Sequence, residues 1–500
     1  MKLNEYAGYD AIGLAKLVAA GEVTPHELSE AALSAAHAIN PTLNAIVEVW
    51  SPEARDMARA MQGGTLAGVP FLIKDLGVSM AGKRSELGSR LAEGMVAPSD
   101  SCLMRRFRQA GLVTLGRSAT PEMAFSTTTE SVQQGATSNP WDPTLMAGGS
   151  SGGAAAAVAS GIVPLAHATD AAGSIRVPAA YTGLFGMKPT RGRSSSGPMA
   201  DEVLGAMATH MGLSRSVRDS AALLDAIQCE PAGEPYYTPA PQYGFLREVG
   251  LAPGTLRIGY MAHAWNGARS QRTMVDAVER VALRLEHLGH RVEPVTLSAG
   301  ASWDAFVHAT TSIWTAWLAN GLDGIAAATG RPLTPDTLEP ATLASYQYGI
   351  NVSAADYLHA LDLRNTVTRA IGAWFHELDV LLTPTLPGMP LRLGLYQQGA
   401  ERLDGLGWTD HVLSHAPFSA FFNMAGTPAM SMPLCTDADS GLPVGLQFAA
   451  GFGREDVLFR LAGQLEQAMP WADRKPRVWA GGVAASMPNK SAEPDRNTAG

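Results

Sequence analysis

Two clusters of small residues are the part of this sequence best suited to covalent chemistry. Gly148 to Gly153 reads Gly-Gly-Ser-Ser-Gly-Gly, and Ala171 to Ser174 reads Ala-Ala-Gly-Ser. Residues with almost no side chain let another group approach the backbone. A serine among them can present its hydroxyl beside backbone N–H groups, which is what a nucleophile and an oxyanion hole require. The stretch from Met146 to Arg176 is therefore a candidate acyl-transfer site.

The first cluster satisfies the pattern G-x-S-x-G twice, once centred on Ser150 and once on Ser151. A nucleophile elbow of this kind directly follows a strand, whereas residues 139–143, Asn-Pro-Trp-Asp-Pro, break one. This context disfavours an α/β-hydrolase triad. Because the stretch contains neither G-x-x-x-x-G-K-[ST] nor G-x-G-x-x-G, it also disfavours a nucleotide-phosphate loop.

The second cluster lies between two opposite charges, Asp170 and Arg176. Three small residues before Ser174 can align successive backbone N–H groups on one oxyanion, while the two charges pair and hold the loop. The alternative interpretation is a tight turn with a solvent-exposed ion pair.

A third candidate is Lys74, which follows the apolar run from Val69 to Ile73. Lysines at strand ends are usually solvated. In an apolar setting, however, desolvation lowers the pKa of a lysine below its reference value of about 10.4, and the neutral amine is a base. A serine with a lysine base is a known alternative to the Ser-His-Asp triad.

Histidines offer a competing base. His167 lies three residues before Asp170, but it belongs to an apolar strand pattern and is expected in the core. His411 and His415 remain alternative bases for a serine hydrolase. The histidines show no metal-ligand spacing, and no metal site is expected. The three cysteines, Cys102, Cys229 and Cys435, are far apart, so they predict core residues and neither a disulfide framework nor a zinc site.

Composition and charge narrow the classes of molecule that this protein is expected to bind. The 500 residues are 46% hydrophobic and 17% charged, with a formal charge of −9 and no basic cluster, which argues against nucleic-acid or anionic membrane binding. We find neither a signal-peptide pattern nor an apolar run of transmembrane length, and we expect a cytoplasmic protein. A small neutral molecule is the expected partner. By length alone, two or three domains are expected.

The elements that must position these residues alternate between strand and helix. The pattern predicts a strand over residues 68–75 that terminates in Lys74-Asp75, a helix over 154–160 and a strand over 163–167, which together indicate an α/β fold. Residues 302–375 read as mostly helical. The four tryptophans of this region are expected in the core, and one or two of them are expected to line a substrate pocket. They are Trp303, Trp314, Trp317 and Trp374.

The three candidate segments together resemble the amidase signature family. They are GVPFLIKD with Lys74, GGSSGGAAAAVASG with Ser150 and TDAAGSIRVPAA with Ser174, in the family's order and spacing. The resemblance covers nearly the whole chain. It implies a single large α/β domain over residues 1–484, with its core at roughly 68–200 and a mixed central sheet covered by helices on both faces. Residues 485–500 are expected to be disordered.

The resemblance also implies residue roles. Ser174 is expected to be the nucleophile that forms the acyl-enzyme, Ser150 the bridging serine of a cis peptide, and Lys74 the base. No cofactor is implied. The oxyanion hole is expected to consist of the backbone N–H groups of Ala171, Ala172, Gly173 and Ser174.

Several short motifs are most similar to the subgroup of 6-aminohexanoate-cyclic-dimer hydrolases: DAAGS, PEM at 121–123, NPW at 139–141 and GRED at 453–456. Phe125 and Ser151 are expected to contact the substrate. The favoured function is hydrolysis of a small, neutral, fairly hydrophobic amide, linear, cyclic or aryl, with esters or carbamates as further substrates, by a monomer or homodimer. The alternatives are a glutaminase or amidotransferase A-type subunit and a non-catalytic binding protein on the same scaffold.

Overall fold

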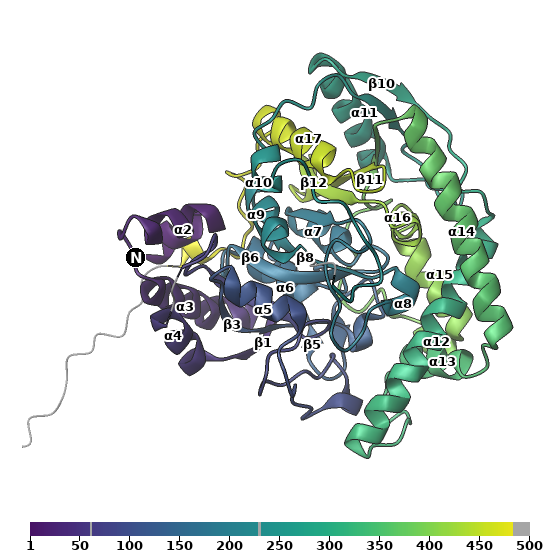
Figure 1. The fold of residues 1–500 in the computed structure, drawn as a ribbon, viewed down its shortest axis with the longest axis horizontal. Helices are drawn as coiled ribbons and strands as arrows, with labels where there is room; N and C mark the ends of the chain where they lie inside the picture. Colours follow the sequence, from purple (N-terminus) through teal and green to yellow (C-terminus); the bar gives the residue numbers. More distant parts are fainter. Residues whose placement is uncertain (61–62, 229–231, 484–500) are drawn as a thin grey trace, which may run out of the picture.

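The computed structural model describes residues 1–60, 63–228 and 232–483. These residues form one large mixed sheet with helices on both faces (Figure 1). The prediction of a single α/β domain with a mixed central sheet is thereby confirmed, in place of the two or three domains expected from length. Cys435 is buried and Cys102 is partly exposed, while Cys229 and the predicted tail at 485–500 lie outside the described residues.

The sheet has eleven strands in the order β1-β3-β2-β6-β8-β7-β12-β13-β11-β9-β10, and β4 and β5 form a separate two-stranded ribbon. Strand β2 is parallel to β3 and β6, and β9 is parallel to β10 and β11, whereas the other neighbours are antiparallel. The strands are β1 (Ile46–Val49), β2 (Pro70–Lys74), β3 (Val113–Ser118), β4 (Glu130–Ser131), β5 (Gly135–Ala136), β6 (Leu165–Asp170), β7 (Phe185–Lys188), β8 (Thr209–Ser214), β9 (Arg257–Tyr260), β10 (Arg291–Pro294), β11 (Val380–Pro384), β12 (Ala429–Thr436) and β13 (Pro443–Ala450).

Helices make up most of the remaining regular structure. They are α1 (Leu3–Gly8), α2 (Ala11–Ala19), α3 (Pro25–Leu43), α4 (Ser51–Arg59), α5 (Cys102–Gln109), α6 (Gly152–Ala159), α7 (Arg176–Thr182), α8 (Val203–Ala206), α9 (Val217–Ile227), α10 (Phe245–Glu248), α11 (Arg272–His287), α12 (Trp303–Thr329), α13 (Pro340–Gly349), α14 (Ala354–Glu377), α15 (Gly405–His415), α16 (Ala420–Ala425) and α17 (Glu455–Ala468).

Twelve of these helices form three groups. Helices α5, α9, α10 and α17 pack on one another and cover the strands β7, β8, β12 and β13, while α6 and α7 pack together against the sheet with α3 beside α6. Helices α12 to α16 contact each other and form an outer layer at the right of Figure 1. A second hydrophobic cluster joins this outer layer to α7 and to the strands β11, β12 and β13, and it is distinct from the larger cluster around the sheet.

Two strands at the centre of the sheet, β7 and β8, were not predicted from the sequence. All six residues of β8 are buried although their sequence, THMGLS, mixes polar and apolar residues without alternation. A strand covered on both faces loses the alternation that identifies a half-exposed strand. Helix α6 is buried in the same way, and its small side chains are covered on every side.

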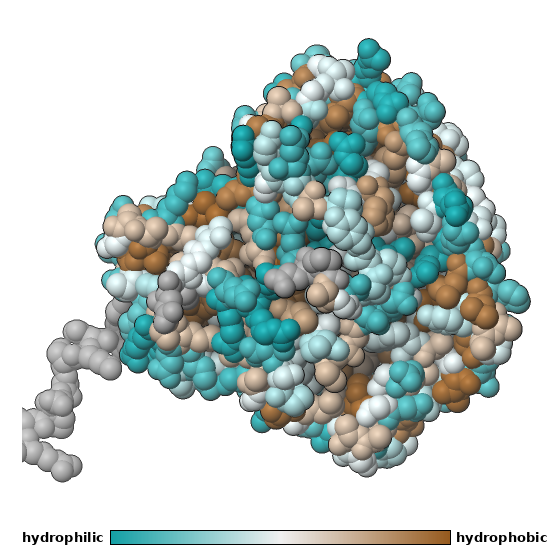
Figure 2. All heavy atoms as spheres, in the orientation of Figure 1, coloured by the Kyte–Doolittle hydropathy of each residue, from teal (hydrophilic) through white to brown (hydrophobic). Residues whose placement is uncertain are grey.

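The surface shows hydrophilic and hydrophobic residues interspersed over the face seen in Figure 2, with the hydrophobic residues in several separate places. Across the described ranges, none of the helices combines the length and apolar character needed to span a bilayer.

Candidate active site

Lys74 ends strand β2 in the interior of the protein. Its side chain has no solvent exposure. Its Nζ lies 2.7 Å from Ser150 Oγ, 3.1 Å from Ser151 Oγ and 2.8 Å from Thr169 Oγ1. The parallel neighbours β2 and β6 both end here, and Thr169 belongs to β6. The structure therefore brings Lys74 and the first serine cluster together.

Burial without a carboxylate partner sets the protonation of Lys74. Desolvation lowers its pKa to about 7, although Asp170 acts in the opposite direction. Because its three contacts are hydroxyl groups, the ammonium form gains no ion pair. A substantial fraction of the amine is therefore neutral near pH 7.

The glycines of the first loop are required by close packing. A Cβ on Gly149 would lie 2.5 Å from the Thr128 carbonyl oxygen, and one on Gly153 would lie 2.5 Å from the Ala45 carbonyl oxygen. The group that approaches this backbone is thus another segment of the same chain. The peptide bond between Gly149 and Ser150 is cis.

Ser151, which is expected to contact the substrate, lies in the interior of the protein. It is fully buried. Its Oγ donates to the Thr169 carbonyl oxygen at 3.3 Å and lies beside Lys74 Nζ. It comes directly before helix α6, and its side chain faces strands β2 and β6. Ser151 therefore contacts the lysine, and its hydroxyl is buried inside the protein.

The second loop is organised by a buried ion pair. Asp170 and Arg176 have no solvent exposure, and Arg176 Nη2 lies 2.8 Å from Asp170 Oδ1. Burial alone would raise the pKa of Asp170, but the charge and hydrogen bonds of Arg176 hold that pKa well below its usual value. The predicted pairing is confirmed, and its burial excludes the alternative of a solvent-exposed ion pair.

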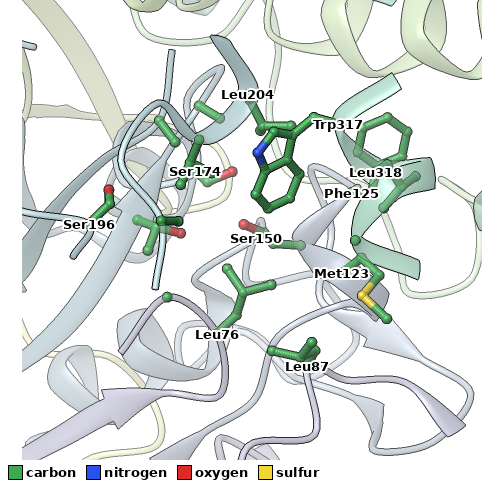
Figure 3. Close-up of a pocket in the computed structure, with 18 of the residues that line it drawn as sticks. Leu76, Leu87, Met123, Phe125, Ser150, Ser174, Ser196, Leu204, Trp317 and Leu318 are labelled. Carbon is green, nitrogen blue, oxygen red and sulfur yellow. The ribbon is translucent and has the colours of Figure 1, made fainter. Parts of the chain in front are cut away.

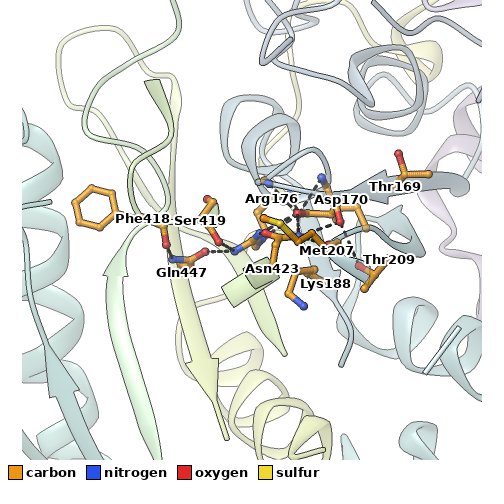
Figure 4. A network of polar contacts seen from close by, with 12 residues as sticks. Thr169, Asp170, Arg176, Lys188, Met207, Thr209, Phe418, Ser419, Asn423 and Gln447 are labelled. Carbon is orange, nitrogen blue, oxygen red and sulfur yellow. Dashed lines mark hydrogen bonds and ion pairs between the residues drawn. The ribbon is translucent and has the colours of Figure 1, made fainter. Parts of the chain in front are cut away.

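Residues far along the chain complete this ion pair (Figure 4). Arg176 donates to Gln447 Oε1 at 2.7 Å, to Asn423 Oδ1 at 2.6 Å and to the Ser419 carbonyl oxygen at 3.0 Å. Asn423 Nδ2 in turn donates to Asp170 Oδ1 at 2.9 Å. Sequence reasoning missed Asn423 and Gln447, because nothing in their local pattern points to a site more than 240 residues away.

The backbone of the second loop turns sharply at Gly173. Its φ is +127°, and a Cβ there would lie 3.0 Å from both Ser419 Cβ and Val177 Cγ2, so glycine is needed for conformation and space. The Gly173 N–H donates to Asp170 Oδ1 at 2.7 Å. In the part of the chain that the structure describes, no protein acceptor is found for the N–H groups of Ala171, Ala172 and Ser174.

Ser150 and Ser174 both line a cavity of about 320 Å³. Its wall is largely apolar and includes Phe125, Trp314, Trp317 and Leu318 (Figure 3). Phe125 and Trp314 make an edge-to-face contact with ring centres 5.5 Å apart. Within the described ranges, no aspartate, glutamate, lysine or arginine lines the cavity. Phe125 and two of the four tryptophans, Trp314 and Trp317, therefore line the cavity.

The histidines considered as bases lie elsewhere. His415 Nε2 is 3.1 Å from the Tyr181 hydroxyl, and His411 Nε2 is 3.0 Å from the Tyr396 carbonyl oxygen. His167 is fully buried, and its Nδ1 accepts a hydrogen bond from the Lys74 backbone N–H at 3.3 Å. The geometry gives a histidine base no support.

Comparison with known proteins identifies the family of the chain. The sequence model of the family described as Amidase matches residues 27–459. The chain is 36% identical over 481 residues to the 6-aminohexanoate-cyclic-dimer hydrolase of Paenarthrobacter ureafaciens, which covers 94% of this chain and 96% of that protein.

Solved structures show the same fold. The structure of a 6-aminohexanoate cyclic dimer hydrolase complexed with substrate is similar with a TM-score of 0.90 and 34% identity, covering 94% of this chain and 99% of that one. A bacterial aryl acylamidase of the amidase signature family is similar with a TM-score of 0.84 and 27% identity, covering 93% and 97%. The chain therefore belongs to the amidase signature family, whose members hydrolyse amide bonds.

Proposed function

We propose that this protein hydrolyses a small, neutral, fairly hydrophobic amide through an acyl-enzyme on Ser174. The observation that carries the proposal is the 2.7 Å contact between Lys74 Nζ and Ser150 Oγ, at the wall of the cavity that Ser174 also lines. A buried amine with a pKa of about 7 can act as a base near neutral pH.

Counting protons on the lysine supports this assignment. Ser151 donates its only hydroxyl proton to the Thr169 carbonyl oxygen. Its Oγ must therefore accept a hydrogen bond from Lys74 Nζ. A neutral amine has two N–H groups and one lone pair. With Ser151 Oγ and Thr169 Oγ1 accepting the two N–H groups, the lone pair is left for the Ser150 hydroxyl. Ser151 and Thr169 are thus positioning residues.

The proposed reaction is a proton relay coupled to nucleophilic attack. Lys74 takes the proton of Ser150, Ser150 takes the proton of Ser174, and Ser174 Oγ attacks the amide carbonyl carbon. When the tetrahedral intermediate collapses, the carbon–nitrogen bond breaks and the same relay returns the proton to the leaving amine. Water, activated by the relay, then hydrolyses the acyl-enzyme.

The oxyanion is assigned to the loop from Ala171 to Ser174. The N–H groups of Ala171, Ala172 and Ser174 have no acceptor among the described residues and are available to the developing negative charge. The Gly173 N–H is donated to Asp170. We therefore assign Gly173 the role of shaping the turn, with any share in the oxyanion hole secondary to that role.

The apolar wall and the relatives indicate the substrate class. Relatives named for a cyclic dimer of 6-aminohexanoate and for aryl acylamides favour cyclic or aryl amides. Linear amides, esters and carbamates are included in the proposal as further substrates. A glutaminase would have to bind the charged α-carboxylate and α-ammonium groups of glutamine, and no charged side chain of the described residues lines the cavity. A cytoplasmic location and a monomeric or homodimeric state are part of the proposal.

A hydrolysis screen tests the function. Aryl, alkyl, cyclic and primary amides and a few carbamates would be incubated with the wild type, and Ser174→Ala would be the blank. We expect turnover and fluorophosphonate labelling by the wild type and neither by the variant. Labelling of Ser174→Ala at the wild-type rate would contradict the assignment of the nucleophile.

A further inference from the structure

A chain of hydrogen bonds leads from the backbone beside the proposed base to the opposite part of the cavity. The Lys74 N–H donates to His167 Nδ1 at 3.3 Å. His167 Nε2 lies 3.3 Å from His210 Nδ1, and His210 Nε2 lies 3.1 Å from Ser196 Oγ. His210 and Ser196 both line the cavity, whereas His167 is buried beneath them. None of these side chains has a role in the proton relay.

The donor-to-acceptor direction of these hydrogen bonds follows from the first donor, the backbone N–H of Lys74. A backbone N–H can only donate, so His167 Nδ1 is an acceptor and the proton of its neutral ring is on Nε2. His210 Nδ1 must then accept, which places the proton of His210 on Nε2, and that N–H donates to Ser196 Oγ. Burial favours neutral rings: it lowers the pKa of His210 to about 4 and that of His167 well below its ordinary value.

Ser196 is consequently fixed as a donor toward the cavity. Its Oγ accepts from His210, and among the described residues its own proton has no protein acceptor. In Figure 3, Ser196 lies on the opposite side of the view from Phe125 and Leu318, with Ser174 and Ser150 between them. By contrast, the hydroxyl of Ser79, which lines the same cavity, spends its proton on the Ser99 carbonyl oxygen at 3.0 Å.

We propose that Ser196 donates a hydrogen bond to a second carbonyl oxygen of the substrate, remote from the bond that is cleaved, so that the preferred substrate carries two amide or ester groups. This inference rests on the proposed function. A neutral carbonyl fits the site because a carboxylate would be desolvated in a cavity whose described lining contains no cation. The apolar wall then holds the remainder of the molecule.

Matched substrates test this assignment. A monoamide would be compared with two diamides in which one CH₂–CH₂ unit is replaced by CO–NH, in the acyl part of one and in the amine part of the other. The measured quantity is the ratio of kcat/KM for diamide over monoamide. We expect Ser196→Ala to lower this ratio about fivefold for one diamide, mainly through KM, because one neutral hydrogen bond is lost. Ser79→Ala, the matched control, should keep the wild-type ratio.

The outcomes separate the two proposals. A ratio that Ser196→Ala leaves unchanged for both diamides, with normal turnover by the wild type, overturns the role of Ser196 and leaves the amidase proposal standing. Absence of wild-type turnover on every amide overturns both.

The donor-to-acceptor direction of the hydrogen bonds from Lys74 to Ser196 can be tested separately. In ¹⁵N-histidine-labelled protein, NMR should show His167 and His210 as neutral rings protonated on Nε2, with the His210 signals identified by their loss in His210→Asn. Protonation of His210 on Nδ1 would make Ser196 the donor to that ring and would overturn the proposal.

Discussion

The two serine loops have nearly the same composition but are held in place by different forces. The loop around Ser150 is fixed by close packing, because its glycines leave no room for a Cβ. The loop around Ser174 is fixed by charge, through the buried pair of Asp170 and Arg176. In the first loop, small residues let the chain pack on itself, and in the second they leave backbone N–H groups free. The glycines of the first loop are therefore needed for space, whereas the small residues of the second loop leave three backbone N–H groups without a protein acceptor among the described residues.

The largest expected effect comes from removing the base beside the first loop. Lys74→Met should lower kcat by about 10³-fold or more, because the relay loses its proton acceptor. Lys188→Met is the matched control: burial also lowers the pKa of Lys188 to about 7, but its Nζ donates to the Pro189 carbonyl oxygen, outside the relay. If folded Lys188→Met were as inactive as Lys74→Met, loss of a buried amine alone would explain the effect.

Removing the charge that holds the second loop should act mainly on stability. Arg176→Met leaves the Asp170 carboxylate buried without its partner, which costs about 3–5 kcal/mol of unfolding free energy. Urea unfolding measures this loss. The double variant Asp170→Asn with Arg176→Met should lose less than the single variant, since no buried charge is left unpaired. A larger loss in the double variant would show that the ion pair is not what fixes the loop.

The two loops should also respond differently to pH. Below a pH of about 7 Lys74 is protonated and has no lone pair, so kcat/KM should fall about tenfold per pH unit and reach a plateau above that value. Asp170 stays ionised throughout, because its pKa lies below its usual value. A profile measured on a neutral amide that stays flat across this range, or that rises only near pH 10, would contradict the assignment of Lys74.

The smallest expected effect tests whether Ser151 orients Lys74 or contacts the substrate. Ser151→Ala removes one acceptor of the Lys74 amine, and we expect kcat to fall about threefold to tenfold with KM nearly unchanged. Steady-state kinetics on one amide measure both parameters. A rise in KM at constant kcat would instead support the original expectation that Ser151 contacts the substrate.

The sequence was informative where chemistry is local. The strand that ends at Lys74 and the pairing of Asp170 with Arg176 followed from runs of neighbouring residues. Phe125, which lines the cavity, was singled out through the resemblance. Together with the resemblance, these runs were sufficient for the α/β fold and the family.

Long-range contacts were not accessible in the same way. Asn423 and Gln447 reach the second loop through folding alone, and strands β7 and β8 are buried on both faces and lack a period. A G-x-S-x-G pattern likewise does not indicate which of two adjacent hydroxyls faces the cavity, which Ser150 lines. That choice depends on backbone conformation, which side-chain types do not specify.

The hydrogen-bond partners of Arg176 also determine when, during synthesis of the chain, the second loop can complete its hydrogen bonds. Gln447 lies on β13 and follows Arg176 by 271 residues. During synthesis, the loop that carries Ser174 leaves the ribosome long before the strand that completes its hydrogen bonds. Contacts of such separation are costly to close and form late. A nascent chain that ends before β13 therefore contains the residues of the proposed relay and still lacks the support of the loop that holds its nucleophile.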